Sequence, residues 1–104
     1  FLRSTLRAVE FIRTNREESL DIIMKYADKE NRNHMKFMLE TELSDAITSQ
    51  TLEKGIGWMT TDQWDGLQQH LLKFGALDGE VSISDAIHTN FLEEIYNEAK
   101  VRWP

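Results

Sequence analysis

The sequence of 104 residues contains no cysteine and a single proline, Pro104. The absence of cysteine excludes disulfide bonds, thiolate nucleophiles and the zinc or iron–sulfur sites that depend on cysteine ligands. Positive charge is also scarce, because 12 lysines and arginines stand against 18 aspartates and glutamates and leave a formal net charge of −6. This acidic balance argues against nucleic acid or an anionic membrane as a partner.

Long apolar runs are missing as well. No stretch approaches the roughly 18–20 apolar residues that a membrane-spanning helix needs, and Phe1 to Arg7 lack the order of charge and hydrophobicity found in a signal peptide. The hydrophobic fraction of 40% is that of an ordinary globular protein, so residues 1–104 form one domain at most. Because the chain opens at Phe1 without methionine and with helical spacing already running, we expect it to be a piece of a longer protein.

Glycine is absent before residue 55, and apolar residues recur at helical spacing along most of the chain. The pattern predicts an all-α fold of five helices, or six, joined by short connectors. The predicted helices cover about residues 2–14, 15–28, 31–47, 61–74 and 90–99, with one further helical turn at 85–87. Asn31 and Asn33 are competing caps for the third of these, and Ser84 is the expected cap of the short turn.

The glycines indicate where the helices are interrupted. The segment Gly55-Ile56-Gly57-Trp58-Met59 is predicted to be a packed connector, because its two glycines allow positive φ or a close backbone approach. Gly75 is placed to end the fourth helix in a left-handed conformation. Gly66 lies inside that helix, where it costs about 1 kcal/mol relative to alanine, so we expect a neighbouring element to press close to it. Val81 and Ile83 alternate with serines, which favours a few extended residues.

The residue types that usually carry catalysis form no recognisable constellation. Asp85 and His88 are three residues apart and Glu30 and His34 are four apart, whereas a di-iron bundle needs two Glu-x-x-His motifs and two further glutamates. The third histidine, His70, has no carboxylate at turn spacing on both sides. No nucleophile elbow, phosphate-binding loop or dinucleotide-binding motif is present. We therefore predict no enzymatic activity, no catalytic residue, no metal site and no cofactor.

The carboxylates are better explained as solvated surface residues, and most aromatic residues as core residues, than as parts of an active site. Most carboxylates lie opposite the apolar stripes or in first helical turns, where solvent and the helix dipole keep them ionised. Trp64, Phe74 and Phe91 recur at the helical spacing of core residues. Trp58 instead lies on the glycine-flanked connector, and it is the one ligand-binding candidate that the sequence offers.

Four short segments, taken in their order and spacing, resemble a known family. They are Phe1-Leu2-Arg3-Ser4-Thr5-Leu6-Arg7-Ala8, Asn15-Arg16-Glu17-Glu18-Ser19, Leu52-Glu53-Lys54-Gly55-Ile56-Gly57-Trp58-Met59-Thr60 followed by Trp64, and Thr89-Asn90-Phe91-Leu92. Together they resemble the C-terminal third of substrate-binding proteins of ABC importers, in the group that serves nitrate, sulfonates, taurine and thiamine-pyrimidine precursors. Arg16 departs from the family, which commonly has proline there, and the extension to Pro104 is longer and more charged than usual.

The resemblance implies a parent protein with a two-lobed α/β fold of the type II periplasmic-binding-protein class. Such a protein closes around a small solute and delivers it to an ABC permease. The parent would be periplasmic, or extracellular and lipid-anchored, with its signal sequence outside this segment. Because most ligand contacts in the family come from earlier in the chain, the helices of this segment would mainly pack against the lobes.

Two alternatives stay open at this point. Related proteins of the same fold bind or synthesise the pyrimidine precursor of thiamine, and a protein of another class, a free-standing helical interaction module, also fits the helical pattern. Whatever the parent, the apolar stripes of the first and third predicted helices exceed what five helices can bury among themselves. We therefore expect the isolated chain to self-associate.

Overall fold

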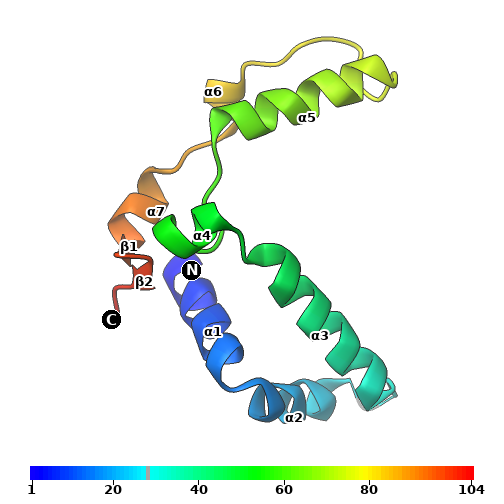
Figure 1. Cartoon of the computed structure of the whole chain (residues 1–104), viewed down its shortest axis with the longest axis vertical. Coiled ribbons are helices and arrows are strands. Elements are labelled where there is room, and N and C mark those ends of the chain that lie inside the picture. Colours follow the sequence, from blue (N-terminus) through cyan, green and yellow to red (C-terminus); the bar gives the residue numbers. More distant parts are fainter. Residues whose placement is uncertain (28) are drawn as a thin grey trace.

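A computed structural model of the chain describes residues 1–27 and 29–104. Within them the fold is mostly helical, with one two-stranded antiparallel sheet, so the all-α prediction is confirmed apart from this hairpin (Figure 1). The elements are α1 (Leu2–Thr14), α2 (Arg16–Tyr26), α3 (Arg32–Ala46), α4 (Ser49–Lys54), α5 (Thr61–Lys73), α6 (Ile83–Ala86), α7 (Asn90–Ile95), β1 (Tyr96–Asn97) and β2 (Lys100–Val101). The described residues thus form seven helices, where the spacing predicted five or six.

Helices α1, α2 and α3 follow the predicted apolar spacing. Asn15 ends α1, and its side-chain Nδ2 donates to the carbonyl oxygen of Phe11 at 3.0 Å. Helix α2 begins at Arg16, so the arginine in place of the family's proline does not prevent the helix from starting there. Of the two competing caps for α3 the structure uses Asn31, whose Oδ1 accepts from the backbone N–H of His34 at 3.1 Å. The predicted end of the second helix, at Asp28, lies outside the described residues.

An exposed ion-pair network joins α2 to α3. The Glu17 carboxylate accepts from Arg32 Nη2 at 3.2 Å and from Lys36 Nζ. These contacts, above all the hydrogen bond from Lys36, hold the pKa of the Glu17 carboxyl below its usual value, and they raise the pKa of the Lys36 amine. Since the three side chains are exposed to solvent, the network fixes the pairing of the helices more than it stabilises the fold.

The segment between α3 and α5 contains a helix that the sequence pattern did not reveal. Residues 49–54 form α4, which starts with a reciprocal cap between Thr48 and Thr51: each side-chain hydroxyl accepts from the other residue's backbone N–H. The packed connector at 55–59 is confirmed, with φ of 112° at Gly55 and 87° at Gly57. Helix α4 escaped prediction because six residues are too few to display an apolar stripe.

Helix α5 matches its prediction at both ends but not in the middle. It starts at the Thr60 cap, and Gly75 follows it with a φ of 71°, in the left-handed region. Among the described residues the expected close neighbour of Gly66 is not found, because a Cβ built there meets no heavy atom within 4 Å apart from its chain neighbours and the backbone of its own helix. The extended conformation expected for Ile83 is also wrong, since this residue begins α6 after a cap at Ser82 rather than at Ser84.

The predicted last helix is too long. Helix α7 stops at Ile95, and the chain reverses through Glu98 and Ala99, both with positive φ, to form the β1–β2 hairpin. In its register Tyr96 pairs with Val101 and Asn97 with Lys100. Tyr96 and Ala99 have helical spacing, but the Tyr96 side chain packs against Gly55 and donates a hydrogen bond to Ile56. This contact favours an extended backbone at Tyr96 over continuation of the helix.

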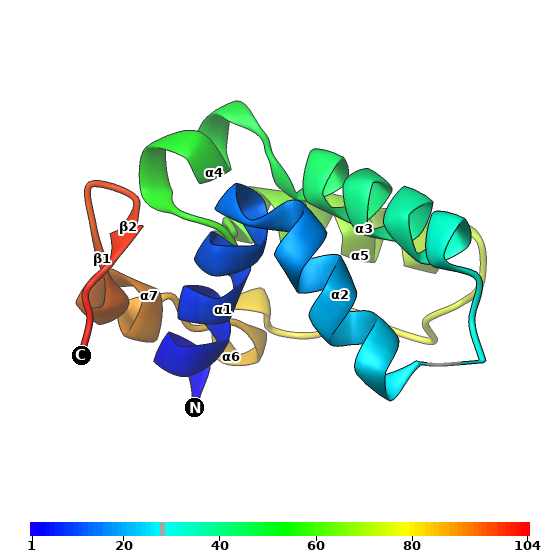
Figure 2. The same ribbon diagram turned by 90° about the horizontal axis from the view of Figure 1, so that it is seen from below.

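The apolar core is small, and it lies where the two ends of the chain meet. Its cluster of buried residues consists of Leu6, Leu92, Ile95, Tyr96 and Val101, with Trp58 packed against it. The remaining helices extend away from this cluster: Figures 1 and 2 show α2 and α3 forming one arm and α5 with α6 another. The radius of gyration is 16.8 Å, whereas a compact domain of this length has about 13 Å. The chain is therefore an open assembly of helices around one packed junction.

Large apolar side chains remain exposed on both arms. Tyr26 and Phe37 are 88% and 66% exposed on the first arm, and Phe74 is 76% exposed at the end of α5. None of the helices in residues 1–27 and 29–104 combines the length and the apolar character needed to cross a bilayer.

Candidate functional site

Trp58, the ligand-binding candidate from the sequence, lies on the turn after α4. Its side chain is half-buried against the apolar cluster, and its backbone N–H donates to the carbonyl oxygen of Gly55 at 3.3 Å. Through these contacts Trp58 fixes the turn against α1 and α7. Its surroundings are those of a packing residue.

The tightest contact beside Trp58 is between Tyr96 and Gly55. A Cβ built on Gly55 would lie 2.5 Å from carbon atoms of the Tyr96 ring, so only glycine fits beneath this ring. The phenol Oη donates to the carbonyl oxygen of Ile56 at 2.7 Å. Burial, followed by the negative charge of Glu10, raises the pKa of the Tyr96 phenol, which therefore stays protonated and keeps donating through the neutral pH range.

Three of the four segments that carry the family resemblance meet at this junction. The first contributes Leu6, the third contributes Gly55 to Trp58, and the last contributes Leu92. The second segment lies at the start of α2, outside this cluster, and contributes the buried Ser19. Three of the four segments are thus brought together as a packing unit.

The histidines do not assemble into a metal site in the described part of the chain. All three are exposed; His34 lies in the first turn of α3, and His70 Nδ1 lies 2.8 Å from the carbonyl oxygen of Gly66 one turn earlier. Among residues 1–27 and 29–104 no group of three or more histidine, aspartate or glutamate side chains could hold a metal ion. The Asp85–His88 and Glu30–His34 spacings therefore lead to no larger cluster.

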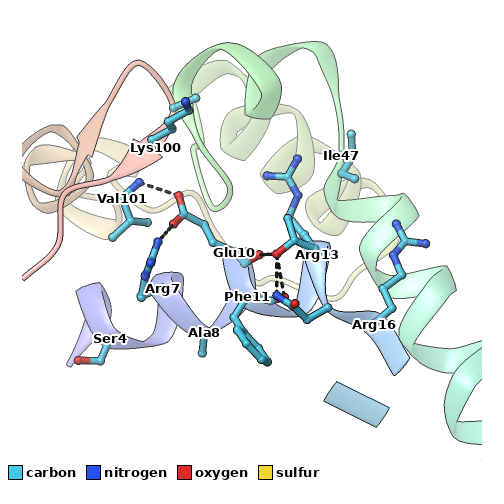
Figure 3. A pocket seen from close by; sticks show the side chains of 13 residues that line it. Ser4, Arg7, Ala8, Glu10, Phe11, Arg13, Arg16, Ile47, Lys100 and Val101 are labelled. Carbon is cyan, nitrogen blue, oxygen red and sulfur yellow. Dashed lines mark hydrogen bonds and ion pairs between the residues drawn. The ribbon is translucent and has the colours of Figure 1, made fainter. Parts of the chain in front are cut away.

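A groove of about 940 Å³ follows the junction of α1 and α2 (Figure 3). Helix α1 and the first residue of α2 line one side, while Ile47 at the end of α3 and the β1–β2 hairpin line the other. We call this the basic groove, after the four cationic side chains on its lining, Arg7, Arg13, Arg16 and Lys100.

Glu10 is the one acidic residue on the lining of the basic groove. Its Oε2 accepts from Arg7 Nη1 at 3.0 Å, and its Oε1 accepts from the backbone N–H of Val101 at 2.7 Å. The Glu10 side chain is 22% exposed; its bond to Val101 is partly buried, whereas its bond to Arg7 is exposed to solvent. Glu10 thereby attaches the C-terminal hairpin to α1, and this attachment holds the last residues of the chain, up to Pro104, close to the first helix.

The other three cations of the basic groove have no acidic partner. Arg13, Arg16 and Lys100 make no ion pair with any residue that the structure describes. Sequence reasoning missed this concentration of charge, because it considered only the acidic balance of the whole chain. A local signal was present: residues 1–16 contain four arginines and a single carboxylate, Glu10. Lys100 is far from these arginines in the chain and could not be added to them from the sequence.

Comparison of the chain with protein-family models, with curated proteins and with solved structures gives no match. The resemblance to the ABC importer proteins therefore stays a prediction that rests on the four segments quoted above.

Proposed function

We propose that this chain is a helical part of the solute-binding component of an ABC importer. In this role its helices pack against the α/β lobes that enclose a small solute of the nitrate, sulfonate, taurine or pyrimidine-precursor class. The whole protein works in the periplasm, or outside the cell on a lipid anchor, and delivers the solute to its permease. The chain contributes packing surface rather than a catalytic step.

The observation that carries this proposal is the excess of accessible surface. The chain exposes 7866 Å², which is about 1,800 Å² more than the roughly 6,100 Å² expected for a compact protein of 12.2 kDa. A surface of about 1,800 Å² per side corresponds to a large permanent interface, since a standard complex buries only about 800 Å² on each partner. The excess of accessible surface therefore supports a role in which these helices pack against a larger protein.

The distribution of the exposed apolar residues supports the same role. They occur on almost every helix, and they include Phe11 and Ile22 at 40% and 41% exposure and Trp64 and Leu67 at 39% and 49%. Isolated exposed apolar residues are ordinary, but a monomer seldom leaves so many on so short a chain. Helices that cover α/β lobes would bury these side chains, as the resemblance implies.

The proposal is tested on the product of the complete open reading frame that contains this sequence. We expect that product to include two α/β lobes, and we expect one of nitrate, taurine, an alkanesulfonate or an aminopyrimidine to raise its Tm with concentration. An open reading frame without such lobes would refute the proposal. If the lobes are present, the absence of any stabilising solute would refute the transport role.

The sequence of the complete open reading frame also separates the two alternatives, the thiamine-precursor protein and the free-standing module. A cytosolic start with a histidine-rich, metal-binding segment upstream would favour the enzyme of thiamine-precursor synthesis. An open reading frame that starts at residue 1 would favour a free-standing interaction module. A signal peptide or lipid-attachment motif is the result that the importer predicts.

A further inference from the structure

We infer that the basic groove is a docking site for an acidic segment of a partner protein. In this arrangement carboxylates of the segment pair with Arg13, Arg16 and Lys100. The inference does not depend on the proposed transport role, because every residue it uses belongs to this chain.

The charge distribution is the first argument. Four of the 12 lysines and arginines line the basic groove, and the only carboxylate among them, Glu10, is already engaged by Arg7 and by the hairpin. Elsewhere in the described chain Arg32, Lys36 and Lys54 pair with carboxylates, while Lys25, Lys73 and Arg102 make no ion pair with a described residue, so the groove is distinguished by the gathering of its cations on one lining. A local excess of positive charge on a chain of net charge −6 is complementary to a negatively charged partner.

The orientation of the side chains is the second argument. Figure 3 shows Arg13 and Arg16 extending from the α1–α2 junction toward the side on which Ile47 and Lys100 lie. Two guanidinium groups on one wall can each bind a carboxylate through two parallel hydrogen bonds, and the ammonium group of Lys100 supplies a third charge from the opposite wall.

The size of the groove favours a protein segment over a small inorganic anion. A water molecule occupies about 30 Å³ of liquid, so a single small anion would fill only a minor part of about 940 Å³. An acidic segment carries several carboxylates, so it can pair with the cations on both walls of the groove at once, which a single small anion does not do.

The test uses the 104-residue chain and two labelled pentapeptides, Glu-Glu-Phe-Glu-Glu and its neutral counterpart Gln-Gln-Phe-Gln-Gln. Binding is followed by fluorescence anisotropy. We expect the acidic peptide to bind more tightly and the triple variant R13Q/R16Q/K100Q to weaken it at least tenfold. The matched control K25Q/K73Q/R102Q removes the same charge from exposed positions outside the groove, and we expect it to change the affinity less than twofold.

Three results would overturn the inference. Equal affinity for the two peptides would show that carboxylates are not recognised, and an equal loss in the control variant would show unspecific attraction by net charge. Stoichiometric displacement of the acidic peptide by nitrate or sulfate at the peptide's own concentration would identify a small-anion site instead. If the triple variant loses its helical circular dichroism, R13K/R16K takes its place: it keeps the charge but removes the guanidinium forks, and unchanged affinity in this variant would contradict the pairing described here.

Discussion

Replacing Gly55 by alanine tests the packing of the junction most sharply. Gly55 has φ of 112° and ψ of 154°, a conformation that is almost exclusive to glycine and costs other residues about 1–3 kcal/mol. The added Cβ would also lie 2.5 Å from the Tyr96 ring, which the hydrogen bond to Ile56 holds in place. Overpacking of this kind typically costs about 1–3 kcal/mol.

The two effects act together, so Gly55→Ala should lower the free energy of unfolding by about 2–6 kcal/mol. That is a large part of the total of about 5–15 kcal/mol expected for a protein of this length. Urea unfolding followed by far-ultraviolet circular dichroism gives the value. Gly66→Ala is the matched control: it lies in the interior of α5 with open space around it, and we expect it to stabilise the chain by about 0.5–1 kcal/mol.

A double-mutant cycle separates the backbone strain from the steric contact. In a Tyr96→Ala background the ring is gone, so Gly55→Ala should cost only the backbone contribution of about 1–3 kcal/mol. A value for Gly55→Ala within about 0.5 kcal/mol of the unsubstituted chain would refute the reasoning, since it would mean that residue 55 has neither the conformation nor the neighbour described here.

Three further predictions concern the same junction. Tyr96→Phe removes the hydrogen bond to Ile56 and should cost about 1 kcal/mol. Because the pKa of Tyr96 is raised in the folded state, the stability that this shift provides is complete below pH about 10 and is lost as the pH rises through the folded pKa. A pH series of unfolding curves should show a steeper alkaline fall in the native chain than in the variant, where the raised pKa of Lys36 remains. Glu10→Ala should abolish the hydrogen-exchange protection of the Val101 amide, whereas Glu10→Gln, which keeps an acceptor, should retain it; equal protection in both would contradict the attachment of the hairpin through Glu10. Trp58→Ala should lower the Tm of the complete protein and leave its solute affinity unchanged, because Trp58 packs against the core; a selective loss of affinity measured by calorimetry would show that it contacts the solute.

The long helices could be predicted from the sequence because their determinants are local. The apolar spacing of α1, the Asn31 cap of α3 and the left-handed Gly75 after α5 each depend on residues within one or two turns. The end of α1 at Thr14 and the start of α5 after Thr60 could be predicted for the same reason.

The short elements and the basic groove could not be predicted, because they depend on contacts between distant residues. Tyr96 leaves the helical pattern on account of its contact with Gly55 and Ile56, some 40 positions earlier. The hairpin is attached by Glu10, which is 91 positions before Val101. Lys100 joins the arginines of α1 and α2 only through that attachment, so the local sequence shows the arginines of residues 1–16 but not the fourth cation of the groove.

The central claim is that the exposed apolar surface of these helices is an interface with another protein body. Light scattering of the isolated chain at tens of micromolar tests it most directly, because apolar surfaces without their partner associate with one another. The account predicts an average mass well above the 12.2 kDa of one chain, decreasing on dilution. A mass equal to one chain throughout the concentration series would contradict it.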